Sequence, residues 1–289
     1  MSSALVTRFA PSPTGPLHLG HAVSAILAHD AAQQAGGRFL LRIEDIDIGR
    51  SRPEHVATIL ADLAWLGLSW DAVAVQSERL TAYDGALERL KAMGVVYPCF
   101  CTRSQIAAEV AASVSAPHGP DGPLYPGTCR DAADAGARVA AGAPHSWRLD
   151  AAAALARTGP LWWTDEELGR FQVDPLVLGD LVLKGRDRPA SYHLAAVADD
   201  AAAQVTLVVR GRDILPSTHA QRLLQALLGL PTPRYRHHRL VADEEGRRLA
   251  KRHNAPTLAA WREAGCDGRA LAERLRAGKL PAGYGFLPD

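Results

Sequence analysis

The sequence predicts an α/β protein built on a parallel β-sheet. Segments with apolar residues at helical spacing alternate with short apolar runs, beginning with residues 21–35, 38–43 and 53–63. Strands and helices that alternate in this way form parallel sheets through right-handed crossovers. The hydrophobic content of 47% suits a globular core. Such sheets bind ligands at the carboxyl ends of their strands, so we expect a site at that edge.

The first connection into a helix is the most informative segment of the chain. Residues 8–21 read RFAPSPTGPLHLGH. Gly15 and Gly20 let the backbone approach a ligand closely, and a helix that begins near His18 directs unpaired N–H groups at an anion. His18 and His21 share one face of the first turn and could stabilise charge that builds up on phosphates. A capped helix with surface histidines is the alternative that these residues alone leave open.

The elements that follow are predicted from periodicity and from stop signals. Residues 21–35 form a helix that ends at Gly36, and residues 38–43 form a short buried strand. Ser51, followed three residues later by Glu54, has the spacing of a capping box and predicts the start of the next helix.

The alternation of predicted strands and helices is interrupted in the middle of the chain. Residues 80–93 are predicted to be helical, but from about residue 98 to 160 the chain is rich in Pro, Gly and Ala, which indicates an inserted subdomain. A strand over 205–209 and a helix through Leu223 and Leu227 resume the sheet pattern. The expected divisions are 1–97 and 191–233 for the two halves of the catalytic domain, 98–190 for the insertion and 234–289 for a short helical C-terminal domain.

Four blocks of the chain resemble the glutamyl-type class I aminoacyl-tRNA synthetases. Residues 8–21 resemble the strand, turn and HIGH motif of that class. Residues 42–47, 209–215 and 248–252 resemble further glutamyl-type blocks, in the right order. The resemblance covers roughly residues 5–265 and implies a Rossmann-type nucleotide-binding domain.

The length of the chain indicates which family within that class it resembles. A chain of 289 residues has room for one catalytic domain with small insertions, whereas a full glutamyl-tRNA synthetase carries an additional anticodon-binding domain. The chain is therefore similar to the glutamyl-queuosine tRNA(Asp) synthetases. That family implies ATP-dependent activation of glutamate without tRNA, transfer to the queuosine base of tRNA(Asp), and a monomer.

The resemblance also assigns a glutamate pocket. Glutamate has two carboxylates and one ammonium group, which suit arginines and an acidic side chain. Arg8, Arg210 and Glu44 have these charges at the matching positions, although each arginine taken singly would be expected in a surface salt bridge. The substrate-binding residues implied are Arg8, Phe9, Ala10, Pro11, Ser12, Glu44, Tyr192 and Arg210.

ATP is expected at the HIGH-like motif and at a loop that resembles KMSKS. The catalytic residues implied are His18, His21 and Lys251, and ATP is expected to contact these three residues and Gly20. In the KMSKS-like loop, Arg248 and Ala250 replace the first lysine and the serine of the motif. Mg²⁺ is expected with the ATP phosphates, held largely by nucleotide oxygens and water. Asp45 and Asp47 are expected to be structural rather than metal ligands.

Three of the four cysteines lie in the predicted insertion. Cys99, Cys101 and Cys129 offer thiolates for a tetrahedral zinc ion, and free buried thiols are the alternative. The resemblance favours Tyr125 as the fourth ligand of one structural Zn²⁺. His118 is chemically the more ordinary ligand and stays a competitor.

Hydropathy and net charge indicate which class of protein to expect. No apolar run reaches the ~20 residues of a membrane span, and no secretory signal is visible, so we expect a cytoplasmic protein that does not enter membranes. A net charge of +1 gives no indication about tRNA. Residues 234–239 contain a basic run that consists of Arg234, Arg236, His237, His238 and Arg239. These residues form either a local basic face or, as we expect, a row of solvated charges.

Three other functions stay open from the sequence. A truncated glutamyl-tRNA synthetase would charge the acceptor end of tRNA. An adenylating enzyme could modify an acceptor other than tRNA. A third possibility is a non-catalytic paralogue, which only the altered loop at residues 248–252 supports. The intact set of His18, His21, Glu44, Arg210 and Lys251 argues against it.

Overall fold

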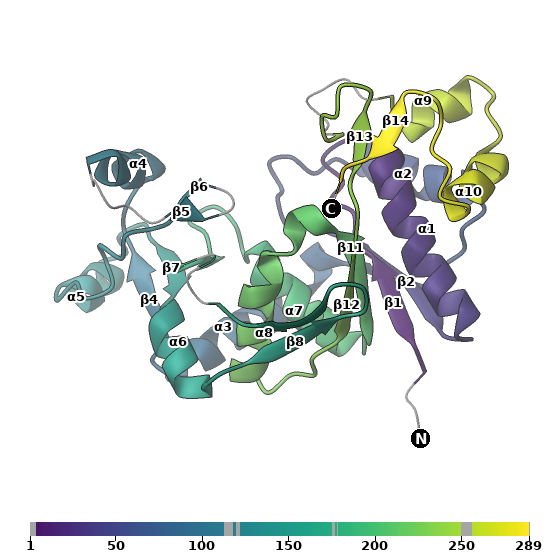
Figure 1. The fold of residues 1–289 in the computed structure, drawn as a ribbon. Coiled ribbons are helices and arrows are strands. Elements are labelled where there is room, and N and C mark those ends of the chain that lie inside the picture. Colours follow the sequence, from purple (N-terminus) through teal and green to yellow (C-terminus); the bar gives the residue numbers. More distant parts are fainter. Residues whose placement is uncertain are drawn as a thin grey trace.

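A computed structural model describes residues 4–112, 118–119, 122–174, 177, 179–249 and 256–288. The side chains of residues 112, 118–119 and 122–123 are not part of that description. Two groups of parallel strands form the centre of the larger lobe (Figure 1). Its strands are β1 (Val6–Phe9), β2 (Arg38–Ile43), β3 (Ala72–Val75), β8 (Trp162–Asp165), β9 (Gly169–Gln172), β11 (Leu207–Gly211) and β12 (Arg234–His238).

The two groups of strands meet at β1 and β11. In one group, β2 pairs in parallel with both β1 and β3; in the other, β12 pairs in parallel with β11 and β8, and β9 is antiparallel at the edge. Thr206, just before β11, donates its backbone N–H to the carbonyl of Val6 at 2.9 Å. This order confirms the α/β class with a parallel sheet, and the strand predicted over residues 38–43 is β2.

Helices cover both faces of the sheet, with α1 and α10 on one side of β1 and α7 and α8 on the other (Figure 1). Helices α1 and α3 agree with the helices expected over 21–35 and 80–93. The helices and helical turns of this lobe are α1 (Leu19–Gln34), α2 (Pro53–Trp65), η1 (Gln76–Arg79), α3 (Leu80–Ala92), α7 (Tyr192–Ala202), η3 (Arg212–Ile214), α8 (Ser217–Leu227), α9 (Leu258–Glu263) and α10 (Gly268–Arg276).

Side chains alternate across the sheet, as the two-residue period of strands requires. In β11, Leu207 and Val209 pack in the same cluster as the apolar side chains of α1, whereas Val208 packs in the cluster of α8. Trp163 and Tyr235 are the largest side chains of the second cluster, each at most 2% exposed. Burial on both faces explains why these strands read as continuous apolar runs.

The capping box predicted at the start of α2 is wrong. The N-cap residue is Arg52, no side chain in the described part of the chain caps the helix, and Pro53 occupies its first turn. The Oγ of Ser51 is buried and has no hydrogen-bond partner among the described residues. Proline fixes the helical φ and needs no N–H acceptor at this position, so the helix begins one residue later than the box would place it.

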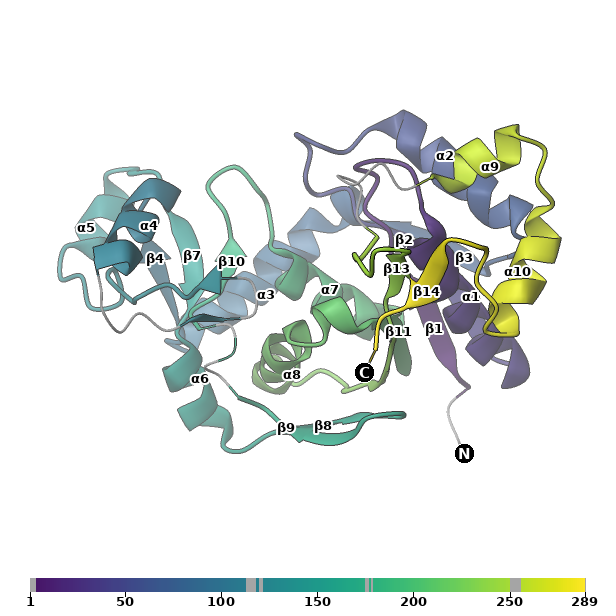
Figure 2. The same cartoon turned by 45° about the horizontal axis from the view of Figure 1, so that its top comes forward.

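The predicted insertion contributes a smaller lobe at one end of the molecule, away from α1 and α10 (Figure 2). Its centre is an antiparallel sheet of order β10–β7–β4. The hairpin of β8 and β9 lies between α6 and β10 in sequence, within the predicted insertion, but it joins the main sheet beside β12. The elements of the lobe are β4 (Val96–Cys99), α4 (Arg103–Ala112), β5 (His118–Gly119), β6 (Gly122–Pro123), α5 (Ala135–Ala140), β7 (Ser146–Leu149), α6 (Ala151–Thr158) and β10 (Val182–Lys184).

The C-terminal segment is not wholly helical, which corrects the expectation for residues 234–289. Strand β12 belongs to the main sheet, and β13 (Val241–Asp243) pairs antiparallel with β14 (Tyr284–Phe286). Helices α9 and α10 pack against α2 and α1. Their apolar residues join the core of the large lobe, which makes these helices its outer layer. No helix in the described part of the chain is long and apolar enough to cross a membrane.

Candidate active site

A cavity of about 550 Å³ opens at the carboxyl ends of β1 and β11, beside the N-terminus of α1. It gathers the residues expected for the glutamate and ATP sites apart from Lys251, so segments far apart along the chain meet at the predicted edge of the sheet. Lys251, with Ala250 and Arg252, lies outside the described residues. The predicted site residues that line the cavity are Arg8, Phe9, Ala10, Pro11, Ser12, His18, Gly20, His21, Glu44, Tyr192 and Arg210.

The two histidines cap α1 reciprocally. The Nδ1 of His18 accepts the backbone N–H of Gly20 at 3.1 Å, and the Nδ1 of His21 accepts the backbone N–H of His18 at 3.1 Å. The ring centroids are 3.8 Å apart. Both histidines are half-buried and line the cavity while they cap the helix. The cap fixes two imidazoles at the positive end of the helix dipole.

A network of buried charges supports the floor of the cavity. The Nε of Arg8 lies 3.0 Å from Asp200 Oδ1, which also accepts from Arg42 NH1 at 2.5 Å. Arg42 pairs in turn with Glu44 Oε1 at 3.1 Å. Charges without partners are rarely tolerated at this depth, so Arg42 and Asp200 hold Arg8 and Glu44 in place.

The network moves the pKa values of its two acids in opposite directions. Burial raises the pKa of Glu44, and the opposing charges of Arg42 and Arg8 do not fully offset it. Burial acts in the same direction on Asp200, but there Arg8 and Arg42 outweigh it and the pKa lies below its usual value. Asp200 is therefore a fixed negative charge at neutral pH, to which the two arginines are anchored.

The adjacent Asp199 has different partners. It accepts hydrogen bonds from Gln76 at 2.9 Å, Arg79 at 2.6 Å and Tyr83 at 2.8 Å. Sequence reasoning missed both aspartates, because they end an alanine-rich helix and carry no motif. Their partners lie more than a hundred residues away along the chain, so only the fold reveals them.

Arg210 is the second buried guanidinium group of the cavity, and the protein holds it from several sides. Its Nε donates to His237 Nε2 at 3.0 Å, its NH1 to Gln221 Oε1 at 2.9 Å and to the Tyr192 hydroxyl at 3.2 Å, and its NH2 to Thr218 Oγ1 at 2.6 Å. An arginine has five N–H donors. One N–H of NH2 thus has no acceptor in the described part of the chain.

An exposed ion pair joins two of the motifs at the rim. Arg248, in the KMSKS-like loop, places NH2 at 2.5 Å from Oδ2 of Asp213, in the block at residues 209–215. Both residues line the cavity. The replacement of the first lysine by Arg248 thus provides a contact across the mouth of the cavity.

Asp45 and Asp47 both have partners within the protein. Asp45 accepts from the backbone N–H of Ser77 at 2.8 Å and from its hydroxyl at 2.7 Å. Asp47 pairs with Arg50 and Arg188, and it lines the cavity. The structural role expected for the two aspartates stays a prediction.

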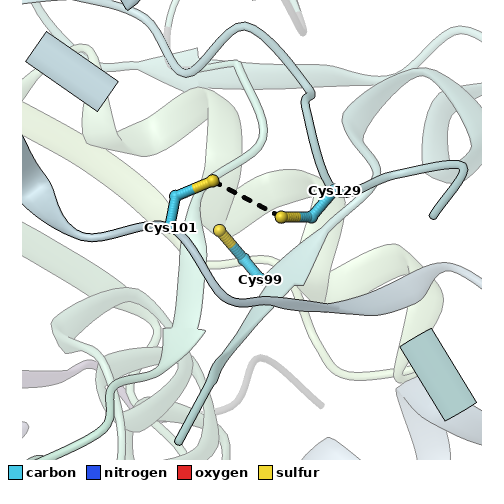
Figure 3. Close-up of side chains that lie close together, drawn as sticks. All are labelled: Cys99, Cys101 and Cys129. Atoms are coloured by element: carbon cyan, nitrogen blue, oxygen red, sulfur yellow. Dashed lines mark hydrogen bonds between the residues drawn. The ribbon is translucent and has the colours of Figure 1, made fainter. Parts of the chain in front are cut away.

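The cysteines of the small lobe form a compact cluster, with the three sulfur atoms turned toward one another (Figure 3). The Sγ atoms of Cys99, Cys101 and Cys129 all lie within 4.8 Å of one another. The hydroxyl of Tyr125 lies 3.4 Å from Cys99 Sγ and 3.8 Å from Cys101 Sγ. Three thiols and a phenol at such distances are a donor set that suits zinc. The side chain of His118, the competing ligand, lies outside the described residues.

The basic run at residues 234–239 is solvated only in part, because Arg234 and Arg239 are exposed whereas its two histidines are not. Arg234 and Arg236 pair with Glu166 at 2.7 and 2.6 Å, which neutralises part of the charge. His237 and His238 are buried, at 0% and 7% exposed. The run is strand β12, whose inward side chains reach the cavity region, so the expectation of solvated charges is wrong for both histidines.

Comparisons with known proteins agree with this arrangement. The family model "tRNA synthetases class I (E and Q), catalytic domain" matches residues 4–277. The chain is 50% identical to the Glutamyl-Q tRNA(Asp) synthetase of Rhodobacter capsulatus, over 91% of this chain and 96% of that protein. It is 46% identical to the protein of that name in Symbiobacterium thermophilum, over 94% and 85% of the two chains.

Solved structures show the same fold. A glutamate tRNA ligase from Elizabethkingia meningosepticum superposes with a TM-score of 0.78 at 28% identity, over 94% of this chain. Glutamate-tRNA synthetase from Elizabethkingia anophelis gives a TM-score of 0.80, also at 28% identity. The chain spans about 60% of the length of these two solved chains.

Proposed function

The chain belongs to the glutamyl-Q tRNA(Asp) synthetases, within the class I family for E and Q, and we propose that it transfers glutamate to the queuosine base of tRNA(Asp). The proposed reaction begins with ATP-dependent formation of glutamyl-adenylate, without tRNA. One observation carries the proposal: a single cavity holds two buried arginines, a buried glutamate, and two histidines at a helix N-terminus.

The charges of the cavity match those of glutamate. Arg8 and Arg210 are the partners of its two carboxylates, and Glu44 is the partner of its ammonium group. One N–H of Arg210 NH2 has no acceptor among the described residues, and the Tyr192 oxygen accepts from Arg210 NH1, so an N–H and the Tyr192 O–H are available to a ligand. Ser12 and the backbone of residues 9–11 complete the proposed wall.

Activation needs positioning and neutralisation of charge more than covalent catalysis by the protein. The α-carboxylate attacks the α-phosphorus of ATP, a C–O–P linkage forms, and pyrophosphate leaves with the electrons of the broken P–O bond. His18, His21 and the N-terminus of α1 stabilise the charge that builds up on the phosphates. Lys251 is proposed to act there too; an unchanged rate of adenylate formation in Lys251→Ala would contradict that role.

The proposed enzyme binds two kinds of metal ion, Mg²⁺ and Zn²⁺. Mg²⁺ neutralises phosphate charge when ATP is bound. Cys99, Cys101, Cys129 and Tyr125 would hold the structural Zn²⁺, which would join β4 to the segment around residue 129. Because the small lobe has little apolar core of its own, such a link would stabilise its fold. A monomer, which the family resemblance implies, and a cytoplasmic location, where ATP and tRNA are found, are part of the same proposal.

The deciding experiment is transfer of labelled glutamate to purified tRNA(Asp) with and without queuosine. Adenylate formation is first measured by glutamate-dependent ATP–pyrophosphate exchange without tRNA. Incorporation that requires queuosine supports the proposal. Incorporation into tRNA(Glu) would instead indicate a truncated glutamyl-tRNA synthetase, and exchange without transfer would indicate another acceptor.

Periodate identifies the acceptor group. It destroys the diol of queuosine and the terminal ribose diol alike, but prior charging of the acceptor end protects the ribose. tRNA(Asp) that is charged, treated with periodate and then deacylated keeps its acceptor end and loses the queuosine diol. We expect it to accept no glutamate, and full incorporation would contradict the assignment to queuosine.

A further inference from the structure

The Asp165, His237 and Arg210 side chains form one buried chain of hydrogen bonds between the β8–β9 hairpin and the cavity. The Oδ2 of Asp165 lies 2.7 Å from Nδ1 of His237, whose Nε2 accepts from Arg210 Nε at 3.0 Å. The side chains of Asp165 and His237 are 0% exposed. The proposed reaction does not use either residue directly.

Arg210, at one end of this chain of hydrogen bonds, determines which atoms donate and which accept. Arginine only donates, so the Nε2 of His237 must be an acceptor and carries no proton. Burial and then the charge of Arg210 lower the pKa of His237 to about 3, which keeps the ring neutral. The single ring proton is therefore on Nδ1 and is donated to Asp165.

Asp165 is itself fixed in position. Its Oδ1 accepts the backbone N–H groups of Glu167 and Leu168, each at 2.9 Å, and its Oδ2 accepts that of His237 at 3.0 Å. Burial would raise its pKa, but these backbone donors and His237 lower it. A carboxylate held by fixed donors is a permanent acceptor, which selects one tautomer of the histidine.

We propose that Asp165 and His237 are positioning residues that set the orientation of Arg210 for a substrate carboxylate. The inference rests on the proposed function, since it takes Arg210 as a partner of glutamate. The Nε2 of His237 accepts one of the four hydrogen bonds that orient the guanidinium plane within the described part of the chain, so loss of this acceptor weakens the hold on that orientation. The hairpin of β8 and β9 thereby sets the affinity for the amino acid from outside the cavity.

Two substitutions of His237 separate this role from a purely structural one. In His237→Gln, the side-chain carbonyl reaches the place of Nε2 and keeps the acceptor for Arg210. In His237→Asn, the shorter amide keeps the donor to Asp165 and removes that acceptor. We expect the KM for glutamate to rise about ten- to hundredfold in His237→Asn and to stay within about threefold in His237→Gln. The KM for ATP is expected to stay unchanged in both.

Asp165→Asn changes the tautomer without changing the shape. An asparagine amide that donates to Nδ1 moves the ring proton to Nε2, where it opposes the Nε–H of Arg210. We expect the same rise in the KM for glutamate. Equal changes of KM in all three variants, or changes confined to their melting temperatures, would overturn the proposal.

A measurement on the unchanged protein tests the tautomer without any variant. Nitrogen-15 NMR of the histidine rings is expected to show His237 protonated at Nδ1 alone, and a proton at Nε2 would overturn the proposal. The activation assay distinguishes failure of the proposed function from failure of the positioning role proposed for Asp165 and His237. If the unchanged protein shows no glutamate-dependent exchange, the proposed function fails and this inference fails with it; if exchange occurs and the variants keep the same KM, only this inference fails.

Discussion

Arg8 and Asp200 form a buried ion pair between residues 192 positions apart in the sequence, with 3.0 Å between Arg8 Nε and Asp200 Oδ1. Arg42 binds the same carboxylate oxygen from the next strand. Asp200 thus ties β1, β2 and α7 together beneath the cavity. Its charge is needed for stability and for the position of Arg8.

Replacement of Asp200 by asparagine is expected to destabilise the protein by about 3 to 5 kcal/mol. The substitution keeps the shape but leaves two buried guanidinium groups without their shared counter-charge. Chemical denaturation measures the free energy of unfolding, and Asp187→Asn, at an exposed position, is the control. A loss no larger than that of the control would show that the ion pair adds nothing to stability.

The contribution of Asp200 should depend on pH in one direction. The folded-state pKa lies below the unfolded value of about 3.9, so the ionised carboxylate stabilises the fold. Its contribution is complete above about pH 4 and is lost as pH falls through the folded-state pKa. We expect the difference in unfolding free energy between the unchanged protein and Asp200→Asn to be constant from about pH 7 to 5 and to narrow below about pH 4. A difference that widens with acid would refute this assignment.

His18→Asn should separate capping from catalysis. Asparagine is a good N-cap residue, so the helix start is retained while the imidazole is lost. We expect the rate of ATP–pyrophosphate exchange to fall about a hundred- to a thousandfold with little change in stability. His18→Ala should lose about 1 kcal/mol of stability as well. Unchanged exchange in His18→Asn would remove His18 from the catalytic residues.

Protein purified without chelators should contain one zinc ion per chain. Metal analysis should show loss of zinc in Cys101→Ser, a lower zinc content in Tyr125→Phe, and full content in Cys266→Ser, whose cysteine is exposed and outside the cluster. If Tyr125→Phe keeps its full zinc content and His118→Ala loses zinc, His118 rather than Tyr125 is the fourth zinc ligand.

Helix α2 offers a stabilising substitution at a residue that does not line the cavity. Its N-cap residue, Arg52, makes no side-chain cap within the described part of the chain, so Arg52→Ser should supply one and raise the unfolding free energy by about 1 kcal/mol. Denaturant titration measures the change, and Arg52→Ala is the matched control. Equal stability of the two variants would show that the first turn is already satisfied.

The family resemblance and the α/β fold could be inferred from sequence because their signals are local. Gly15, Gly20, His18 and His21 lie within one short turn, and the apolar period of each strand and helix is complete within its own segment. The clustering of three cysteines could also be anticipated, because Cys99 and Cys101 are two residues apart. The predicted domain boundaries, and the roles assigned to the site residues, stay predictions.

Local signals failed where the tertiary structure competed with them. Ser51 and Glu54 have the spacing of a capping box, but Pro53 and the docking of the preceding loop begin the helix at another residue. Residues 234–238 carry charges typical of a solvated segment, yet they are strand β12, since pairing with β11 and β8 buries two of them. Propensity is a weak preference that sheet pairing overrides.

The turn and helix proposed to receive phosphates, the alternation of strands and helices, and the cysteines proposed for zinc could all be inferred from the amino-acid sequence, because each depends on neighbours within a few positions. The acids that hold Arg8 and the histidine that holds Arg210 became evident only in the folded protein. Asp200 and His237 carry no motif, and their contacts exist only after distant strands pair. The burial that makes these hydrogen bonds strong is a property of the whole fold, since it requires layers of helices on both faces of the sheet.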